Sequence, residues 1–212
     1  MQKSTILFLI SLLFIATSCA TYTLEKDLKV VTLEKPIYNA PYFSNSEIDY
    51  VYKANITVYG NELSGIFIVK KINETTHRAV FTTEFGNKLL DFEISDSYFK
   101  INFIVDELNR KLLINTLKTD FKLLLKNNYD IKEQFENELF KVYLIKDGKN
   151  FDYLYLNKSN EKLSKIVLAS KRKEKISIEY TSENNIFANS IIIQHQNLRL
   201  QIKLNYINTK TE

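Results

Sequence analysis

Apolar and polar side chains alternate along most of this chain, and this period of two favours a fold built from β-strands. From about residue 50 to residue 206, short alternating segments follow one another and are separated by turns rich in Asn, Asp and Gly. The last segment is the clearest, because one face carries Leu198, Leu200, Ile202, Leu204 and Tyr206. Short links make neighbouring strands antiparallel. The pattern predicts about eleven strands, roughly five before residue 106 and six after residue 138.

One segment has a longer period. Between residues 106 and 126 the apolar side chains recur every three or four residues, with lysines between them. This spacing predicts an amphipathic helix with Asp106 as its N-cap, and we expect a short helical turn at residues 131–136. A large sheet curls, and its apolar face needs a cover. We therefore expect an α+β, mostly β fold: an antiparallel curved sheet, open as a half-barrel, covered by the central helix.

The first nineteen residues have the layout of a secretory signal. Lys3 gives a positive start, residues 6–15 form an uncharged apolar run, and small residues precede Cys19, the single cysteine. The run is shorter than the roughly 20 apolar residues that cross a bilayer. Residues 16–19, Ala-Thr-Ser-Cys, resemble the lipobox of bacterial lipoproteins. An ordinary secretory signal is the alternative interpretation.

The lipobox implies a diacylglyceryl group and fatty acyl chains such as palmitate on Cys19, which would anchor the protein to a membrane. Sorting rules of such lipoproteins imply the outer membrane and a periplasm-facing domain, because Ala20 and Thr21 are not acidic. We therefore divide the chain into a signal peptide (1–18), a tether (19–47), a half-barrel domain (48–207) and a C-terminal tail (208–212). Within the tether, residues 30–31 and 38–43 are apolar enough to pack on the domain.

Composition and motifs give little support for catalysis or for nucleic-acid binding. The formal net charge of +4 is mild, and we interpret the basic run at residues 171–173 as a solvated turn. His77 and His195 have no second His, Cys or carboxylate at ligand spacing. Asp91 and Glu93 share a strand face that we expect to point to solvent. We expect no enzyme activity, no metal and no cofactor; a hydrolase would need a cleft with carboxylates or a perturbed histidine.

A family resemblance follows from the lipobox, from the order of strands, helix and strands, and from residues 83–90, Thr-Glu-Phe-Gly-Asn-Lys-Leu-Leu. Over residues 48–207 the pattern resembles the LolA/LolB-like carriers and receptors of bacterial outer-membrane lipoproteins. The resemblance implies that acyl chains lie between the sheet and its helical cover. It also implies a membrane or lipid-transfer loop, in which Phe85 holds the place of an exposed leucine and Gly86 the turn. Ordinary packing at a strand end is the alternative for Phe85.

Eight apolar or aromatic side chains are candidates for a cavity between sheet and helix: Phe67, Phe81, Phe92, Phe103, Leu117, Phe121, Tyr153 and Tyr180. The other interpretation is that they fill the core, which is the usual role of such residues. With a cavity, the protein would bind an acyl chain, a lipid or a lipidated protein. Without one, it would be a structural or assembly lipoprotein that presents a protein-binding surface. The sequence identifies no protein partner.

Overall fold

The structure is a computed structural model that describes residues 27–170 and 173–207. Cys19, with the predicted signal, lies outside the described residues, and so do Lys171, Arg172 and the tail at 208–212. In the described part, no helix is both long enough and apolar enough to cross a membrane.

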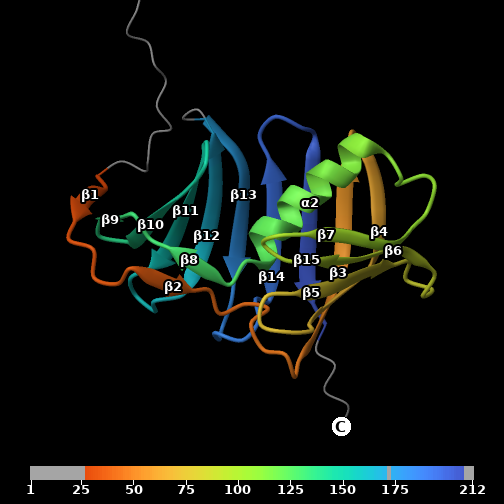
Figure 1. Cartoon of the computed structure of the whole chain (residues 1–212), viewed down its shortest axis with the longest axis horizontal. Helices are drawn as coiled ribbons and strands as arrows, with labels where there is room; N and C mark the ends of the chain where they lie inside the picture. The colour runs from red at the N-terminus through yellow and green to blue at the C-terminus, as the bar shows by residue number, and fades with distance from the viewer. Residues whose placement is uncertain (1–26, 171–172, 208–212) are drawn as a thin grey trace, which may run out of the picture.

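The described elements are fifteen strands and one helix (Figure 1). In chain order they are β1 (Lys29–Val31), β2 (Ile37–Asn39), β3 (Asp49–Val58), β4 (Asn61–Lys71), β5 (His77–Thr82), β6 (Lys88–Ile94), β7 (Phe99–Ile104), α2 (Lys111–Leu125), β8 (Asn128–Asp130), β9 (Glu133–Glu136), β10 (Phe140–Asp147), β11 (Asn150–Asn157), β12 (Leu163–Ser170), β13 (Lys173–Thr181), β14 (Ser190–His195) and β15 (Leu200–Tyr206).

Thirteen of these strands form a single antiparallel sheet in the order β1-β9-β10-β11-β12-β13-β14-β15-β3-β4-β5-β6-β7. β2 and β8 form a separate pair. The two halves of the sheet meet where β15 pairs with β3, with Tyr206 opposite Tyr52. The sheet is curved and open, with β1 and β7 at its edges, and α2 lies across it in front of β14, β15 and β3 (Figure 1).

The fold class predicted from the alternation is confirmed, but the strand count is wrong. β3–β7 and β10–β15 are the eleven long strands that the pattern predicts. The four additional strands, β1, β2, β8 and β9, have three or four residues each, which is too short to display a period of two. Residues 131–136 were expected to form a helical turn, but pairing with β10 makes Glu133–Glu136 a strand instead.

The helix is shorter than predicted at its start. Asp106 does not cap it, because residues 105–110 form turns in which the Asp106 carbonyl accepts a hydrogen bond from the Asn109 amide (3.1 Å). The N-cap position is Arg110, whose backbone is extended and whose side chain makes no capping hydrogen bond. The first turn of α2 also lacks an acidic residue. α2 therefore begins without the polar support that helix N-termini usually receive.

Part of the predicted tether belongs to the folded domain. β1 pairs with β9, and the side chains of Tyr42 and Phe43 are buried in the main core. The amide of Ala40 donates a hydrogen bond of 2.7 Å to the carbonyl of Asn127, directly after α2. Residues 29–43 therefore pair with and pack against the sheet and the end of the helix, and the apolar residues 30–31 and 38–43 belong to this packed part.

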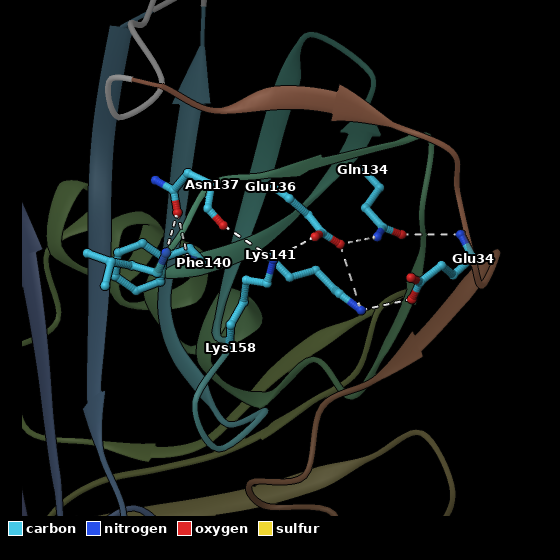
Figure 2. Close-up of polar contacts among 8 residues, drawn as sticks. Glu34, Gln134, Glu136, Asn137, Phe140, Lys141 and Lys158 are labelled. Atoms are coloured by element: carbon cyan, nitrogen blue, oxygen red, sulfur yellow. Dashed lines mark hydrogen bonds and ion pairs between the residues drawn. The ribbon is translucent and has the colours of Figure 1, made fainter.

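A polar network fixes this N-terminal segment to the edge of the sheet (Figure 2). Lys141 on β10 forms an ion pair of 2.8 Å with Glu34, whose amide also donates to the side chain of Gln134 (3.2 Å). Glu136 accepts hydrogen bonds from Lys158 and Gln134, each at 2.9 Å. The hydrogen bond from Lys158 lowers the pKa of Glu136. These contacts join the segment before β2 to β9 and β10.

The core has two parts. The larger lies on the covered face of the sheet, beneath α2 and the N-terminal segment, and contains most of the buried side chains. The smaller lies on the opposite face of β9–β12, where Phe135, Val142, Tyr155 and Val167 pack together. Alternation on β11 explains the division, since Leu154 belongs to the first cluster and its neighbour Tyr155 to the second.

Candidate functional site

An apolar cavity lies between α2 and the sheet and is the candidate ligand site. It has a volume of about 60 Å³, and every side chain that lines it is apolar. The lining comes from β3, β4, β5, β6, β15, α2 and the loop before α2: Ala54, Ile56, Val58, Leu63, Phe67, Phe81, Leu90, Leu108, Leu113, Leu117, Phe121, Leu200, Ile202 and Leu204.

Small residues on β3 and β4 leave space between the sheet and α2 at this cavity. Ala54 on β3 and Gly65 on β4 are register partners on the covered face. A methyl group at Gly65 would collide with the backbone oxygen of Thr82 and would press on the ring of Phe81. Gly65 therefore lets Phe81 lie across β4, where its ring forms one wall of the cavity.

The middle of α2 is held by aromatic packing. The ring of Phe121 stacks on Phe67 of β4, with centroids 4.9 Å apart, and on Phe92 of β6, with centroids 5.0 Å apart. Leu117, one turn earlier, is also buried and lines the cavity. Offset aromatic pairs add about 0.5–1.5 kcal/mol each beyond the burial of their area. This packing marks the end of the cavity nearer the C-terminus of α2.

A buried polar contact joins the helix to the sheet next to this packing. The carboxylate of Asp120 on α2 lies 2.8 Å and 3.0 Å from Nε2 of His195 on β14, and both side chains are almost fully buried. Burial raises the pKa of Asp120, and the hydrogen bond to His195 opposes that rise. The sequence shows no carboxylate at ligand spacing from His195; its carboxylate partner lies 75 residues away, so no local spacing could reveal it.

The two ends of α2 are held differently. After the helix, the side chain of Asn127 donates to the carbonyl of Tyr42 (3.0 Å), and the hydroxyl of Tyr129 donates to the carbonyl of Leu123 (3.4 Å). At the other end Arg110 makes no cap, and Leu112 is 66% exposed. The C-terminal end of α2 is therefore fixed by polar contacts, whereas the N-terminal half contacts the sheet through apolar side chains.

The structure brings four of the eight cavity candidates together. Phe67, Phe81, Leu117 and Phe121 line the cavity. Phe92 lies behind Phe121 in the core, and Tyr180 is buried farther along the sheet against Tyr42, with ring centroids 5.0 Å apart. Burial raises the pKa of the Tyr180 hydroxyl well above its usual value.

Phe103 and Tyr153 do not face the cavity. A register shift between β6 and β7 places Phe92 opposite Ile101 but Asp91 opposite Phe103. This bulge inverts the alternation, so Phe103 lies on the outer face and is 43% exposed. Tyr153 packs with the smaller hydrophobic cluster, because odd-numbered residues of β11 face away from α2.

The loop that the family resemblance singles out is a tight turn between β5 and β6. Gly86 has a positive φ of 86°, and its amide donates to the carbonyl of Thr83 (3.0 Å). Phe85 is 94% exposed at the tip of this turn. Ordinary strand-end packing does not account for so exposed a ring.

The remaining polar candidates have structural partners. His77 is buried with Nε2 at 2.7 Å from the carbonyl oxygen of Phe43, and burial lowers its pKa. Asp91 was expected to point to solvent, but its side chain is only 1% exposed because Arg78 and Lys88 cover it at 2.8 Å and 3.0 Å. These ion pairs hold the pKa of Asp91 far below its usual value. In residues 27–170 and 173–207, no three His, Cys, Asp or Glu side chains form a group that could hold a metal ion.

Comparison with known proteins supports the fold. No family model and no curated protein sequence matches the chain. A LolA superfamily protein from Nitrosomonas europaea has a similar structure, with a TM-score of 0.50 and 10% identity over 80% of this chain and 88% of that one. A DUF1329 family protein from Desulfovibrio piger and a domain from Vibrio parahaemolyticus with a proposed role in outer membrane lipoprotein sorting each give a TM-score of 0.44 and 9% identity, over 80% of this chain and 89% of theirs. The likeness to the Nitrosomonas protein shows that this chain has a LolA-like fold.

Proposed function

We propose that this protein is a non-enzymatic lipoprotein that binds an acyl chain, from a lipid or from a lipidated protein, between α2 and the curved sheet. The observation that carries this proposal is the cavity, whose fourteen lining side chains are all apolar. Such a site offers no hydrogen bond for orientation and gains its affinity from apolar area removed from water, at about 25 cal/mol per Å². It therefore suits a hydrocarbon chain better than a polar substrate.

Binding requires α2 to move. The cavity volume of about 60 Å³ is less than half of the roughly 150 Å³ that holds a benzene-sized molecule. The N-terminal half of the helix is the part free to move, because its contacts with the sheet are apolar and its first turn is uncapped. An acyl chain would replace the apolar contacts that Leu113 and Leu117 lose, so the exchange costs little.

The membrane anchor is part of the same proposal. We infer that Cys19 carries the diacylglyceryl group and that the protein is held on the outer membrane with its domain facing the periplasm. The lipobox-like sequence before Cys19 supports the anchor. The exposed ring of Phe85 supports a role for the turn between β5 and β6 in contact with the bilayer during lipid transfer.

The closed state of the cavity supports one alternative function. If α2 does not open, the protein has a filled core and presents only its surface to partners. It would then be a structural or assembly lipoprotein. Crosslinking in whole envelopes distinguishes the two functions, because a single dominant protein partner without bound lipid supports the alternative.

Lipid analysis tests the acyl site directly. Full-length protein purified from its own membranes is examined by native mass spectrometry, and uptake of a fluorescent fatty acid is then titrated. Ala54→Val adds two carbons to the wall of the cavity, and we expect it to weaken uptake at least 10-fold. Ala79→Val is the matched control, since Ala79 is also fully buried in the core but does not line the cavity. Absence of bound lipid and of uptake, or equal losses in both variants, would contradict the acyl site.

Two further variants test the anchor and the loop. Cys19→Ala should move the protein from the membrane to the soluble fraction, and continued retention would contradict lipidation. Phe85→Asp should reduce transfer of the fluorescent fatty acid to phospholipid vesicles without changing its uptake, because Phe85 is at the turn and not at the cavity. Unchanged transfer would exclude the turn from membrane contact.

A further inference from the structure

A second, polar pocket lies on the other flank of α2, away from the apolar cavity. It has a volume of about 210 Å³ and lies between the helix and the hairpin of β10 and β11. Lys118 and Lys122 of the helix and Lys126 at its C-cap line the pocket at intervals of four residues. The hairpin contributes Asp147 and Asp152. Positive and negative groups therefore face the same space from opposite sides.

Asp152 is one of the residues that line this pocket, and one of its two carboxylate oxygens lacks a hydrogen-bond partner. Its side chain is 4% exposed, and its Oδ1 atom is buried without a hydrogen bond in the part of the chain that the structure describes. Burial of the carboxyl group raises its pKa to about 6. A buried polar atom without a partner costs the folded state free energy, so such atoms are rare in native proteins. A carboxyl group of perturbed pKa that lines a cleft is a candidate for a binding site.

The lysines lie close to Asp152 but do not neutralise it. Lys126 and Lys122 both lower its pKa through electrostatic attraction, yet neither ammonium group comes within 4.0 Å of the carboxylate. The ammonium of Lys126 lies instead over the ring of Tyr129, at 4.9 Å from its centroid. Asp152 therefore lacks a hydrogen-bond donor, and three lysines line the same pocket.

We propose that this pocket binds a phosphate ester that also carries an ammonium group, as in phosphoethanolamine. The ammonium group pairs with the carboxylate of Asp152, and the phosphate oxygens accept hydrogen bonds from Lys118 and Lys122. Three ammonium groups in one row favour a phosphate over a carboxylate, because the phosphate can carry more negative charge. The same chemistry occurs in a free metabolite and in a phospholipid headgroup. The inference does not depend on the acyl site, since the two pockets share no residue.

Isothermal titration of the full-length protein with O-phosphoethanolamine tests the proposal. We expect measurable binding, and binding of inorganic phosphate alone or of ethanolamine alone to be at least 10-fold weaker. Asp152→Asn and Lys122→Gln should each reduce the affinity at least 10-fold. Asp130→Asn and Lys111→Gln are the matched controls, because both residues are exposed and lie outside the pocket. No binding of O-phosphoethanolamine, or equal effects of the pocket and control variants, would overturn the site.

Two additional ligands identify the source and the anion. A short-chain phosphatidylethanolamine that binds at least 10-fold more tightly than O-phosphoethanolamine would support a lipid headgroup, and weaker binding would support a free phosphate ester. β-Alanine that binds as tightly as O-phosphoethanolamine would overturn the phosphate assignment. Circular dichroism confirms that each variant is folded. Ala54→Val should leave this binding unchanged, so failure of the acyl site and failure of the phosphate site are distinguishable.

Discussion

The two flanks of α2 solve the same packing problem in different ways. On one flank, Phe67, Phe81 and Ala54 form an apolar wall whose side chains carry no hydrogen-bonding group. On the other, Asp152 faces three lysines across a pocket and keeps an unpaired oxygen. The buried pair of Asp120 and His195 lies close to the line that divides them.

The difference between the flanks is one of ligand selectivity: the apolar flank is adaptable and the polar flank is selective. Apolar contacts are not directional, so the first flank can exchange a leucine side chain for another hydrocarbon at little cost. A buried carboxylate accepts only a donor in a narrow range of positions, so the second flank selects its partner by geometry. One helix thus covers an apolar cavity that tolerates different hydrocarbons and a polar pocket that selects by hydrogen-bond geometry. Each can be altered by mutation without changing a residue of the other.

The largest effect should come from Phe121→Ala. The variant removes the ring that stacks on Phe67 and Phe92 and leaves a void under α2. We expect a loss of about 4 kcal/mol in the free energy of unfolding, measured by urea denaturation. Leu112→Ala on the exposed face of α2 is the control and should change stability by less than about 0.5 kcal/mol. Similar small losses in both would mean that apolar packing does not hold the helix.

Breaking the polar contact between the flanks should have the next largest effect. Asp120→Ala leaves the ring of His195 buried without its partner, and we expect a loss of about 3 kcal/mol in the free energy of unfolding. A double-mutant cycle with His195→Ala should give a coupling energy of about 1–3 kcal/mol. Additive losses would show that the two side chains contribute through packing and not through their hydrogen bond.

Asp152→Asn should stabilise the protein, in contrast to the two preceding variants. The folded state raises the pKa of Asp152 from 3.8 to about 6 and so binds its proton more tightly than the unfolded state. Wild-type stability should therefore fall as pH rises from about 4 to about 6, by as much as about 3 kcal/mol, and stay reduced above that range. Thermal denaturation across pH should show this slope in the wild type and a smaller one in the variant. Asp130→Asn, at an exposed position outside the pocket, is the control; an equal slope in wild type and Asp152→Asn would refute the assignment.

The smallest effect should come from Arg110→Ser at the N-cap of α2. The backbone of Arg110 already has the extended conformation of an N-cap, and serine can accept a hydrogen bond from the first turn. We expect a gain of about 1 kcal/mol in the free energy of unfolding. If the N-terminal half of α2 must lift for an acyl chain to enter, fatty acid uptake should also slow. Faster uptake by a more stable protein would argue against opening at this end.

The sequence predicts the long strands and the helix well because both depend on local alternation of apolar residues. Only half of the eight residues predicted to line the cavity do so, since the face on which each side chain lies depends on the register of its strand. The bulge that turns Phe103 outward is an example: nothing between residues 99 and 105 distinguishes it from a regular strand. The pairing of Asp120 with His195 depends on how the whole sheet curls under α2. The unpaired oxygen of Asp152 depends on the positions that the lysine side chains of the pocket adopt in the folded protein. Such features arise from tertiary structure alone.

The pairing of β15 with β3 has a consequence for biosynthesis. The strand that joins the two halves of the sheet is translated after every other described strand, and it lies next to the first long strand. Until residues 200–206 emerge, the seven residues 52–58 of β3 lack their partner strand, and such an unpaired edge is the kind of surface that recruits strands from other chains. A nascent chain, or a chain truncated before residue 200, should therefore aggregate.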